Sequence, residues 1–215
     1  MKDYKVFLRQ KNETWQQALE RFFSFREADM QEYFSNKDYP YRFADNRAYD
    51  YYPLEKVPEQ YFADFSNQNN INVPENLRNM LIHHGGFRIG ASLLEIYSDT
   101  IENRILFTLR DILIEYGYKD FIEKIGTGML KSLSNYYFFF GVSFPESEEF
   151  EFLFFDKAGN FGKMLFAVNN EDIVLKKILP SMFNGSIDKF TLDELITIQI
   201  DRVIINALTV KGYIN

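Results

Sequence analysis

The order of the predicted elements indicates an α+β protein with a central antiparallel sheet flanked by helices. Helical patterns occupy the first part of the chain, three strand-like runs lie between residues 136 and 168, and an apolar helix follows them. Strands that follow one another through short turns pair as antiparallel neighbours, whereas a parallel sheet needs strands that alternate with helices. We therefore predict a meander of strands covered by helices, with a helical and tyrosine-rich extension at the N-terminus.

The amino-acid composition is typical of a globular protein. The 215 residues are 46% hydrophobic and 26% charged, and the aromatic share of 18% includes 23 Phe and 14 Tyr. There are no cysteines, which excludes disulfides, thiolate metal sites and cysteine nucleophiles. The first residues lack the apolar stretch of a secretory signal, and no run of about 18 apolar residues occurs. We therefore expect a cytoplasmic protein without a membrane segment.

The negative charge lies in the body of the chain. The net charge is −7: residues 1–50 carry nine bases and nine acids, whereas residues 51–215 carry 15 bases and 22 acids. An acidic body repels phosphate backbones, and no basic cluster interrupts it, so we expect no nucleic-acid binding. A basic protein partner would instead be attracted to it.

Residues 1–58 are predicted to form an extension that packs on a core domain of residues 59–215. Asn12 is the expected N-cap of a first helix, whose apolar face comprises Trp15, Ala18, Leu19, Phe22 and Phe23. The prolines that follow argue against another long helix, so we predict an ordered connection with one or two short helices and aromatic anchors. Packing against the domain is favoured over a lid above a site. Its tyrosines include Tyr49, Tyr51 and Tyr52.

The central part of the chain predicts a helix, a strand and a longer helix. Pro74 fits the first position of the helix, where its missing N–H costs nothing, and Gly85 fits the left-handed position just beyond the end. Its apolar face comprises Leu77, Met80 and Leu81. A strand is expected around residues 93–97. Ser98 or Asp99 would then cap a long amphipathic helix with apolar residues Ile101, Ile105, Leu109, Ile112, Leu113 and Tyr116.

The second half of the chain predicts a short helix, a meander and a final helix. The short helix covers "YKDFIEKIG", and strands are expected over residues 136–142, 150–155 and 161–168. The last two strands are joined by "DKAGN", a turn sequence in which Gly159 can take a positive φ. Thr191 and Glu194 form a capping-box pattern that begins the final helix. This helix is apolar on more than one side, so it should be largely buried.

The sequence contains few candidates for a catalytic or ligand site. His83 and His84 would point about 100° apart on a helix, so we interpret them as residues of the last turn rather than as joint metal ligands. The glycine-rich stretches around Gly85 and Gly126 match neither a phosphate-binding loop nor a dinucleotide fingerprint. No G-x-S-x-G nucleophile elbow occurs. We therefore predict no catalytic, cofactor-binding or metal-binding residues.

The stretch "FPESEEFEF" places acids next to phenylalanines. Phe150, Phe152 and Phe154 share one face of the predicted strand and should turn inward, whereas Glu149 and Glu151 share the opposite face. The acids have three interpretations: a solvated outward edge, a surface that binds a partner, or a catalytic pair of carboxylates. Catalysis is least favoured because nothing in the sequence predicts an environment that separates their pKa values. A membrane role is disfavoured because acidic charge repels anionic lipids.

Several short motifs, in order, resemble the Smi1/Knr4 family, also called the SUKH superfamily. "INVPENLRNMLIHHGGF" is similar to the family's Leu-Pro-Glu helix start and Asn-Gly-Gly helix end, and "SLLEIYS" is similar to the strand that follows. "FEFLFFDKAGNFGKMLFAV" resembles the family's aromatic strand and Asp-x-x-Gly turn. "DKFTLDELI" resembles its Ser-Phe-Glu-Glu-Phe-Leu helix. The resemblance covers roughly residues 60–208.

The resemblance implies an antiparallel sheet flanked by helices and no enzymatic activity or cofactor. Bacterial members of the family are typically immunity proteins that neutralise a cognate secreted toxin, often a nuclease or a nucleic-acid deaminase. Charge complementarity would speed the capture of a basic toxin by this acidic chain. We therefore expect a non-enzymatic immunity protein, with the partner contacts Glu146, Glu148, Glu149, Glu151, Tyr49, Tyr51 and Tyr52.

Two alternatives to this function remain. The first is a regulatory scaffold or protein-interaction module of the same fold that has no toxin partner. The second is an enzyme that uses Glu149 and Glu151 as acid and base. The sequence predicts neither the identity of the toxin nor the oligomeric state.

Overall fold

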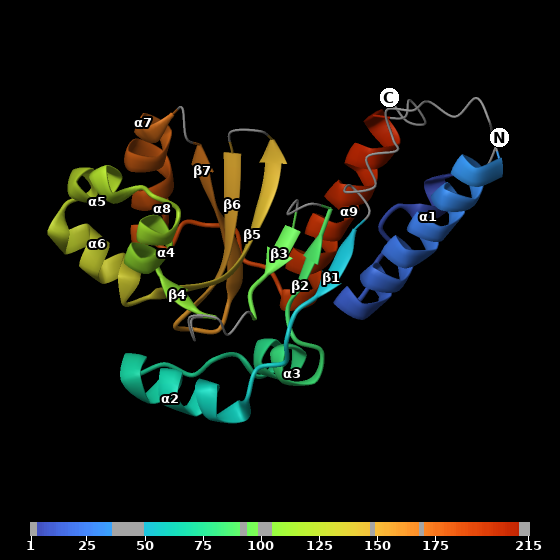
Figure 1. Cartoon of the computed structure of the whole chain (residues 1–215). Coiled ribbons are helices and arrows are strands. Elements are labelled where there is room, and N and C mark those ends of the chain that lie inside the picture. Colours follow the sequence, from blue (N-terminus) through green and yellow to red (C-terminus); the bar gives the residue numbers. More distant parts are fainter. Residues whose placement is uncertain are drawn as a thin grey trace.

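A computed structural model of the protein describes residues 4–35, 50–90, 94–98, 105–146, 149–167 and 170–210. It has the predicted α+β architecture, in which a twisted antiparallel sheet carries helices on both faces (Figure 1). Within these ranges, no helix combines the length and the apolar character needed to cross a bilayer. The sheet separates two hydrophobic clusters, one on each face.

The strands lie across the sheet almost in the order of the sequence. Every pair is antiparallel, and the order is β1 (Tyr51–Pro53), β2 (Phe87–Ile89), β3 (Leu94–Ile96), β5 (Tyr137–Glu146), β6 (Glu149–Asp156) and β7 (Phe161–Ala167). The short strand β4 (Phe107–Thr108) also pairs with β5. The four strands predicted around 93–97, 136–142, 150–155 and 161–168 are confirmed as β3, β5, β6 and β7, although residues 93 and 168 lie outside the described ranges.

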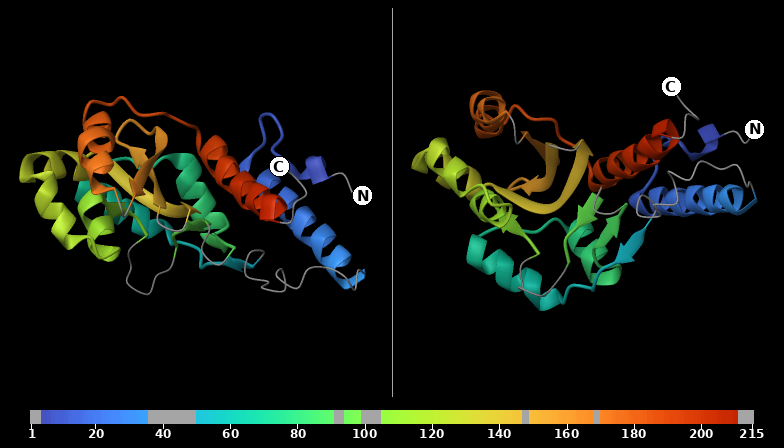
Figure 2. Two further views of the ribbon diagram at one scale, coloured as in Figure 1. Left: turned by 90° about the horizontal axis from the view of Figure 1, so that it is seen from above. Right: turned by 45° about the horizontal axis from the view of Figure 1, so that its top comes forward.

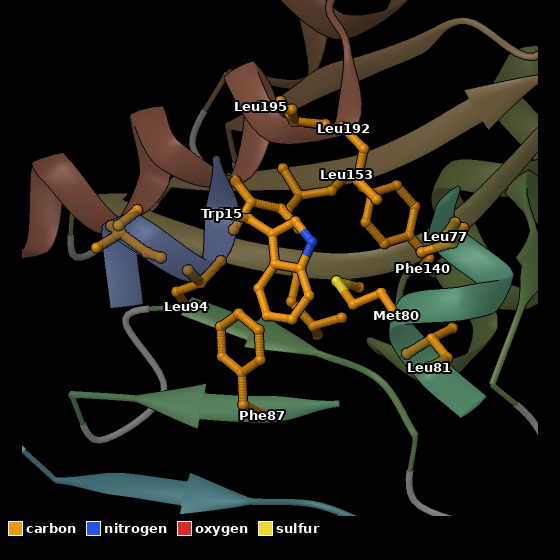
Figure 3. Packing of buried hydrophobic residues seen from close by; sticks show 14 of the residues in the cluster. Trp15, Leu77, Met80, Leu81, Phe87, Leu94, Phe140, Leu153, Leu192 and Leu195 are labelled. Atoms are coloured by element: carbon orange, nitrogen blue, oxygen red, sulfur yellow. The ribbon is translucent and has the colours of Figure 1, made fainter. Parts of the chain in front are cut away.

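The first hydrophobic cluster lies on the face of the sheet that the last helix covers. Its helices are α1 (Trp15–Ser35), α2 (Glu59–Asn69), α3 (Glu75–His83) and α9 (Leu192–Val210). α1 lies beside α9 in both views of Figure 2. Figure 3 shows Trp15 within this cluster, among side chains from α3, α9 and the strands. We call this side of the sheet the α9 face.

The second hydrophobic cluster lies on the opposite side of the sheet, which we call the α4 face. Its helices are α4 (Leu109–Glu115), α5 (Lys119–Ile125), α6 (Thr127–Ser134), α7 (Glu171–Ile173), the π-helical turn η4 (Val174–Ile178) and α8 (Leu179–Phe183). The sheet residues that belong to this cluster come from β4 to β7. These helices therefore cover one part of the sheet, whereas β1 to β3 contribute to the cluster of the α9 face.

Both faces of β6 are buried, and this corrects the prediction of an outward face. Phe152 and Phe154 pack in the cluster of the α4 face, and Phe150 is half-buried beside them, as predicted. Leu153 and Phe155 alternate with these residues and are also fully buried, in the cluster of the α9 face. The sequence alternation did not predict this second burial because it depends on α9, which packs from a distant part of the chain.

The first helix begins two residues later than an Asn12 cap would allow. Thr14 is the cap: its Oγ1 accepts from the Gln17 backbone N–H at 3.3 Å, and Gln17 Oε1 accepts from the Thr14 N–H at 2.9 Å. Asn12 instead adopts a left-handed turn with a φ of 58°. The predicted apolar face is confirmed except at Phe23, which is 37% exposed and lies edge-on against the Tyr51 ring.

The long helix predicted after Ser98 is wrong over residues 105–108, which form a bend and the strand β4. The Ser98 hydroxyl accepts a hydrogen bond from the Gly86 backbone N–H at 2.6 Å, and residues 99–104 lie outside the described ranges. β4 then precedes α4, because Thr108 and Asp111 form a capping box that begins the helix at Leu109. The apolar periodicity was real over α4 but extended too far towards the N-terminus.

Other local predictions are confirmed. Leu77, Met80 and Leu81 are buried in α3, which begins one residue after Pro74, and Gly85 has a φ of 79°. α5 lies within "YKDFIEKIG", Gly159 has a φ of 83°, and the capping box of Thr191 and Glu194 begins the buried helix α9. Sequence analysis missed the short strands β1, β2 and β4, as well as α6 and the helical segment from α7 to α8.

The predicted boundary between residues 58 and 59 stays a prediction. It falls directly before α2, and residues on both of its sides enter the cluster of the α9 face. From the proposed extension, β1 joins the sheet through β2, and α1 packs on α9. The predicted connection partly lies outside the described ranges, which omit residues 36–49.

Candidate functional site

The residues predicted to contact a partner lie in different environments. Glu149 is half-buried at the first position of β6. Of Glu146, opposite it at the end of β5, only the backbone is described. Glu148 and Tyr49 lie outside the described ranges. Glu151 is buried, with a side chain that is 8% exposed.

Glu151 is the centre of a buried ion cluster, which corrects its predicted place on an outward edge. Its Oε1 accepts from Lys163 Nζ at 2.8 Å, and its Oε2 accepts from Gln199 Nε2 at 3.2 Å and from Arg202 Nη1. Lys163 lies on β7, whereas Gln199 and Arg202 lie on α9. A buried carboxylate requires such partners because its desolvation is costly. Glu151 therefore fastens α9 to the sheet.

Tyr51 and Tyr52 lie on opposite faces of the sheet. The Tyr51 ring stacks on Phe87 in the cluster of the α9 face, and burial raises the pKa of its hydroxyl. Tyr52 pairs directly with Arg88 across β1 and β2, is 51% exposed, and donates its hydroxyl to Asp50 Oδ2 at 3.0 Å. Of these two tyrosines, only Tyr52 presents a large exposed surface.

One row of paired residues crosses the α4 face from an exposed end to a buried end. Tyr52 pairs with Arg88, which pairs with Glu95, which pairs with Val142 and then Phe152. Val142 and Phe152 are fully buried under the helices, whereas the side chains of Arg88 and Glu95 are 38% and 16% exposed. The row turns polar where the hydrophobic cluster of this face ends. In Figure 1, none of the described helices lies in front of β1 to β3.

Two tyrosines mark the border between the covered and the polar part of the α4 face. The hydroxyls of Tyr97 and Tyr116 are hydrogen-bonded at 2.9 Å. Burial, and then the neighbouring tyrosine, raises the pKa of Tyr97 well above its ordinary value. The Tyr116 ring lies edge-on against Phe150 and Phe152, with centroids 5.6 and 5.0 Å away. This border is therefore rigid and aromatic.

Carboxylates surround this border. The pKa of Tyr116 is raised to about 12, mainly by burial and also by the charges of Glu95 and Glu115, while the hydrogen bond from Tyr97 and the charge of Arg88 oppose the shift. These three charges therefore lie within electrostatic reach of one hydroxyl. Arg88 donates to Glu95 at 2.7 Å, and Glu115 is exposed, so these two acids and one base make the group net acidic.

We define the tyrosine–glutamate face as Tyr52, Arg88, Glu95, Tyr97, Glu115, Tyr116 and Phe150. Most of it was missed by sequence reasoning, which singled out only Tyr52. The available signal was the single charged residue in the middle of the short strands "FRI" and "LEI", which alternation places on one face. Glu149 precedes Phe150 in the sequence, but the alternation of β6 places it on the same face as Glu151, on the other side of the sheet.

The two histidines have surroundings that agree with their interpretation as helix-end residues. They line a shallow pocket of about 400 Å³ between the start of α1, the end of α3 and the start of α9. The His84 ring lies edge-on against Trp15, with centroids 4.8 Å apart. Among the described residues, no group of three or more His, Asp or Glu side chains is placed to hold a metal ion.

Comparison with known proteins adds no further information on function. Neither a protein-family model nor a curated protein sequence matches this chain. The proposals below therefore rest on the sequence motifs and on the geometry of the described residues.

Proposed function

We propose that this protein is a non-enzymatic immunity protein that binds and neutralises a basic protein toxin that acts on nucleic acids. The toxin class comes from the resemblance to the Smi1/Knr4 family. The observation that carries the binding role is the tyrosine–glutamate face, because it combines rigid, partly exposed aromatic rings with net acidic charge.

The chemistry of this face suits a basic protein. Tyrosine is enriched among residues that dominate binding energy because it offers a large contact area at a small cost in side-chain entropy. Tyr52 supplies an exposed ring, and Tyr97 and Tyr116 hold each other in place. The net charge of −7 attracts a basic partner before contact, and Glu115 adds local negative charge where the partner would dock.

The first test is neutralisation in cells. The protein is co-expressed with the toxin encoded beside it, and growth and complex formation are measured. We expect cells to survive and a stoichiometric complex to purify. If cells die as fast with the protein present and no complex purifies, the proposal is wrong. A stable complex with a partner that is neither toxic nor basic would favour the regulatory scaffold.

The second test locates the binding surface. Glu115→Lys should lower the association rate about three- to tenfold at low salt, because it reverses a charge that steers the partner. Glu20→Lys is the matched control: Glu20 is also exposed on a helix but lies on α1, whose buried residues belong to the cluster of the α9 face. Tyr52→Ser should mainly raise the dissociation rate, by about tenfold. If Glu115→Lys and Glu20→Lys lower the association rate equally, the tyrosine–glutamate face is not the binding surface.

A further inference from the structure

A second pocket lies between α6 and α8, at the other end of the β5–β6 hairpin. Its volume is about 370 Å³, and its apolar lining includes Leu133, Met182 and Ile187. β5 begins here at Tyr137 and runs to Glu146 at the acidic end of the hairpin. At about 3.3 Å per residue, the two ends of this ten-residue strand are separated by about 30 Å. None of the residues that line the pocket belongs to the tyrosine–glutamate face.

Two large aromatic side chains stand exposed at this pocket. Tyr136 is 40% exposed and Phe183 is 53% exposed, and both line the opening. Only six large hydrophobic side chains are exposed among the described residues, so two of the six meet at one pocket. Exposed aromatic rings beside a concave apolar floor are the surface features that receive an anchoring side chain from a partner.

The walls of the pocket are held in place before any ligand binds. The Tyr137 hydroxyl donates to the Met182 carbonyl at 2.7 Å and joins β5 to α8. α8 ends in a Schellman motif, in which Ser186 N–H donates to the Ser181 carbonyl at 2.8 Å and Gly185 N–H donates to the Met182 carbonyl at 3.0 Å. Gly185 supplies the required positive φ of 69°. A preformed pocket loses little entropy when it binds.

Two acceptors of the pocket, the Asp156 carboxylate and the Met182 carbonyl, already receive hydrogen bonds. The Asp156 carboxylate accepts from the backbone N–H groups of Ala158 and Asn160, both at 2.9 Å, and from the Asn160 side chain. The Met182 carbonyl accepts from Tyr137 and Gly185. The polar lining also contains the exposed ammonium of Lys189, which only donates, and the side chains of Ser132 and Asn184, which donate or accept.

Lys189 is the exposed charged side chain of the lining, whereas the Asp156 carboxylate is buried and already hydrogen-bonded. Lys157 is exposed and lies beside the pocket, because its N–H donates to the Tyr136 carbonyl at 3.0 Å. Asp188, next to Lys189 in the sequence, is exposed but is not part of the lining. Lys189 beside the apolar lining therefore favours an occupant that carries a carboxylate next to an apolar group.

We propose that this pocket, the anchor socket, binds a segment of a protein partner in which a large apolar side chain lies next to carboxylates. The apolar side chain enters between Tyr136 and Phe183, and a neighbouring Asp or Glu pairs with Lys189. This preference is opposite in charge to that of the tyrosine–glutamate face. The proposal does not depend on the toxin-binding function.

The probes are three capped pentapeptides added to the isotope-labelled full-length protein and followed by NMR. They are Asp-Glu-Phe-Asp-Glu, the same peptide with Ala in place of Phe, and Lys-Lys-Phe-Lys-Lys. We expect saturable shifts at Tyr136, Phe183 and Lys189 with the first peptide, and shifts at least about fivefold smaller at equal concentration with the other two. Equal shifts with the Ala or Lys peptide, or shifts only elsewhere, would overturn the proposal.

Variants test the two halves of the recognition separately. Phe183→Ser should lower the affinity for the first peptide about tenfold, because it removes an aromatic wall. Lys189→Glu should lower this affinity about fivefold, because it reverses the charge. Both residues are exposed, so folding is checked by the unchanged spectrum of the rest of the protein. Lys119→Glu is the matched control, an exposed lysine outside the pocket at the first position of α5.

Self-association is the competing occupant and is measured by sedimentation of the protein alone. A monomer at all concentrations agrees with a socket for a different partner. A concentration-dependent dimer that Phe183→Ser abolishes would assign the socket to a second copy of this chain and would overturn the proposal.

Discussion

Charged side chains are buried on the α9 face of the sheet and partly exposed on the α4 face. On the α9 face, the cluster includes residues from β1 to β3 and from β5 to β7, and the side chains of Glu13, Arg21 and Glu151 are buried in ion clusters. On the α4 face, the helices cover β4 to β7, and the residues of the same rows on β1 to β3 are polar and partly exposed. A charged side chain that a helix covers forms ion pairs within the fold. A charged side chain beyond the helices can instead contact a partner.

The α9 face contains two ion clusters that hold elements far apart in the sequence. One joins Glu151 to β7 and α9, as described above. In the other, Arg21 of α1 pairs with Glu13 at 2.8 Å and with Asp201 of α9 at 3.0 Å, and donates to the Phe7 carbonyl at 2.6 Å. If these charges are structural, substitutions on the α9 face should lower the free energy of unfolding more than substitutions on the exposed part of the α4 face.

The largest expected effect is that of Arg21→Ala. The variant leaves the Glu13 carboxylate, whose side chain is 4% exposed, without its cation. Asp201, the second acid that Arg21 contacts, loses the same cation. We expect the free energy of unfolding to fall by about 3–5 kcal/mol, as for other buried pairs that lose one partner. Urea denaturation measures the change, and the exposed neighbour Glu20→Ala should stay within about 0.5 kcal/mol of the original protein.

The next effect separates the two neighbouring glutamates. Glu151→Ala should destabilise by about 2–3 kcal/mol; the loss is smaller because Lys163 and Arg202 are partly exposed and can regain water. Glu149→Ala should change stability by less than about 0.5 kcal/mol, because Glu149 is only half-buried and the Glu151 cluster remains intact. If thermal and urea unfolding place the two variants at equal stability, Glu151 is not a structural carboxylate.

Alkaline pH should lower the free energy of unfolding through Tyr116 on the α4 face. The pKa of Tyr116 is about 12 in the folded protein against an ordinary value of 10.0, so its neutral form is favoured by folding. This stabilisation is complete below pH 10 and is lost as the pH rises towards 12, by about 2 kcal/mol for this residue. Stability measured from pH 8 to 12, with tyrosinate absorbance, checks it. Constant stability across this window would contradict the buried state of Tyr116.

The smallest effect concerns the tyrosine pair. Tyr97→Phe removes the hydrogen bond to Tyr116 and should cost about 1 kcal/mol, since the remaining Tyr116 hydroxyl is only partly buried and can bond to water. Tyr52→Phe removes the exposed bond to Asp50 and should cost less than about 0.5 kcal/mol. A larger loss in Tyr52→Phe would mean that Tyr52 supports the fold rather than presents a surface.

Local signals in the sequence predicted most of the secondary structure. The strands of the meander, the turn at Gly159, the end of α3 at Gly85 and the start of α9 at Thr191 all depend on residues within a few positions of one another. The long helix after Ser98 failed because apolar spacing continued through a segment in which Thr108 and Asp111 set the true helix start. Sequence analysis gave no assignment to α6 or to α7–α8.

The candidate site was predicted only in part. The acids of "FPESEEFEF" and the tyrosines around residue 50 were identified as surface residues, but the described structure buries Glu151 and turns Tyr51 towards the α9 face. Arg88, Glu95 and Tyr116 come from three separate elements, and only the pairing of the strands and the packing of α4 bring them together.

The sequence by itself determined the alternation of the strands, the helix caps, the tight turns and the acidic net charge, because each is a property of neighbouring residues or of composition. The tertiary structure decided which charges are buried. Glu151 and Gln199 are 48 residues apart in the sequence, yet they are hydrogen-bonded at 3.2 Å. Burial depends on which distant element covers a face, and α9 covers Glu151 whereas no described helix covers the row from Tyr52 to Glu95.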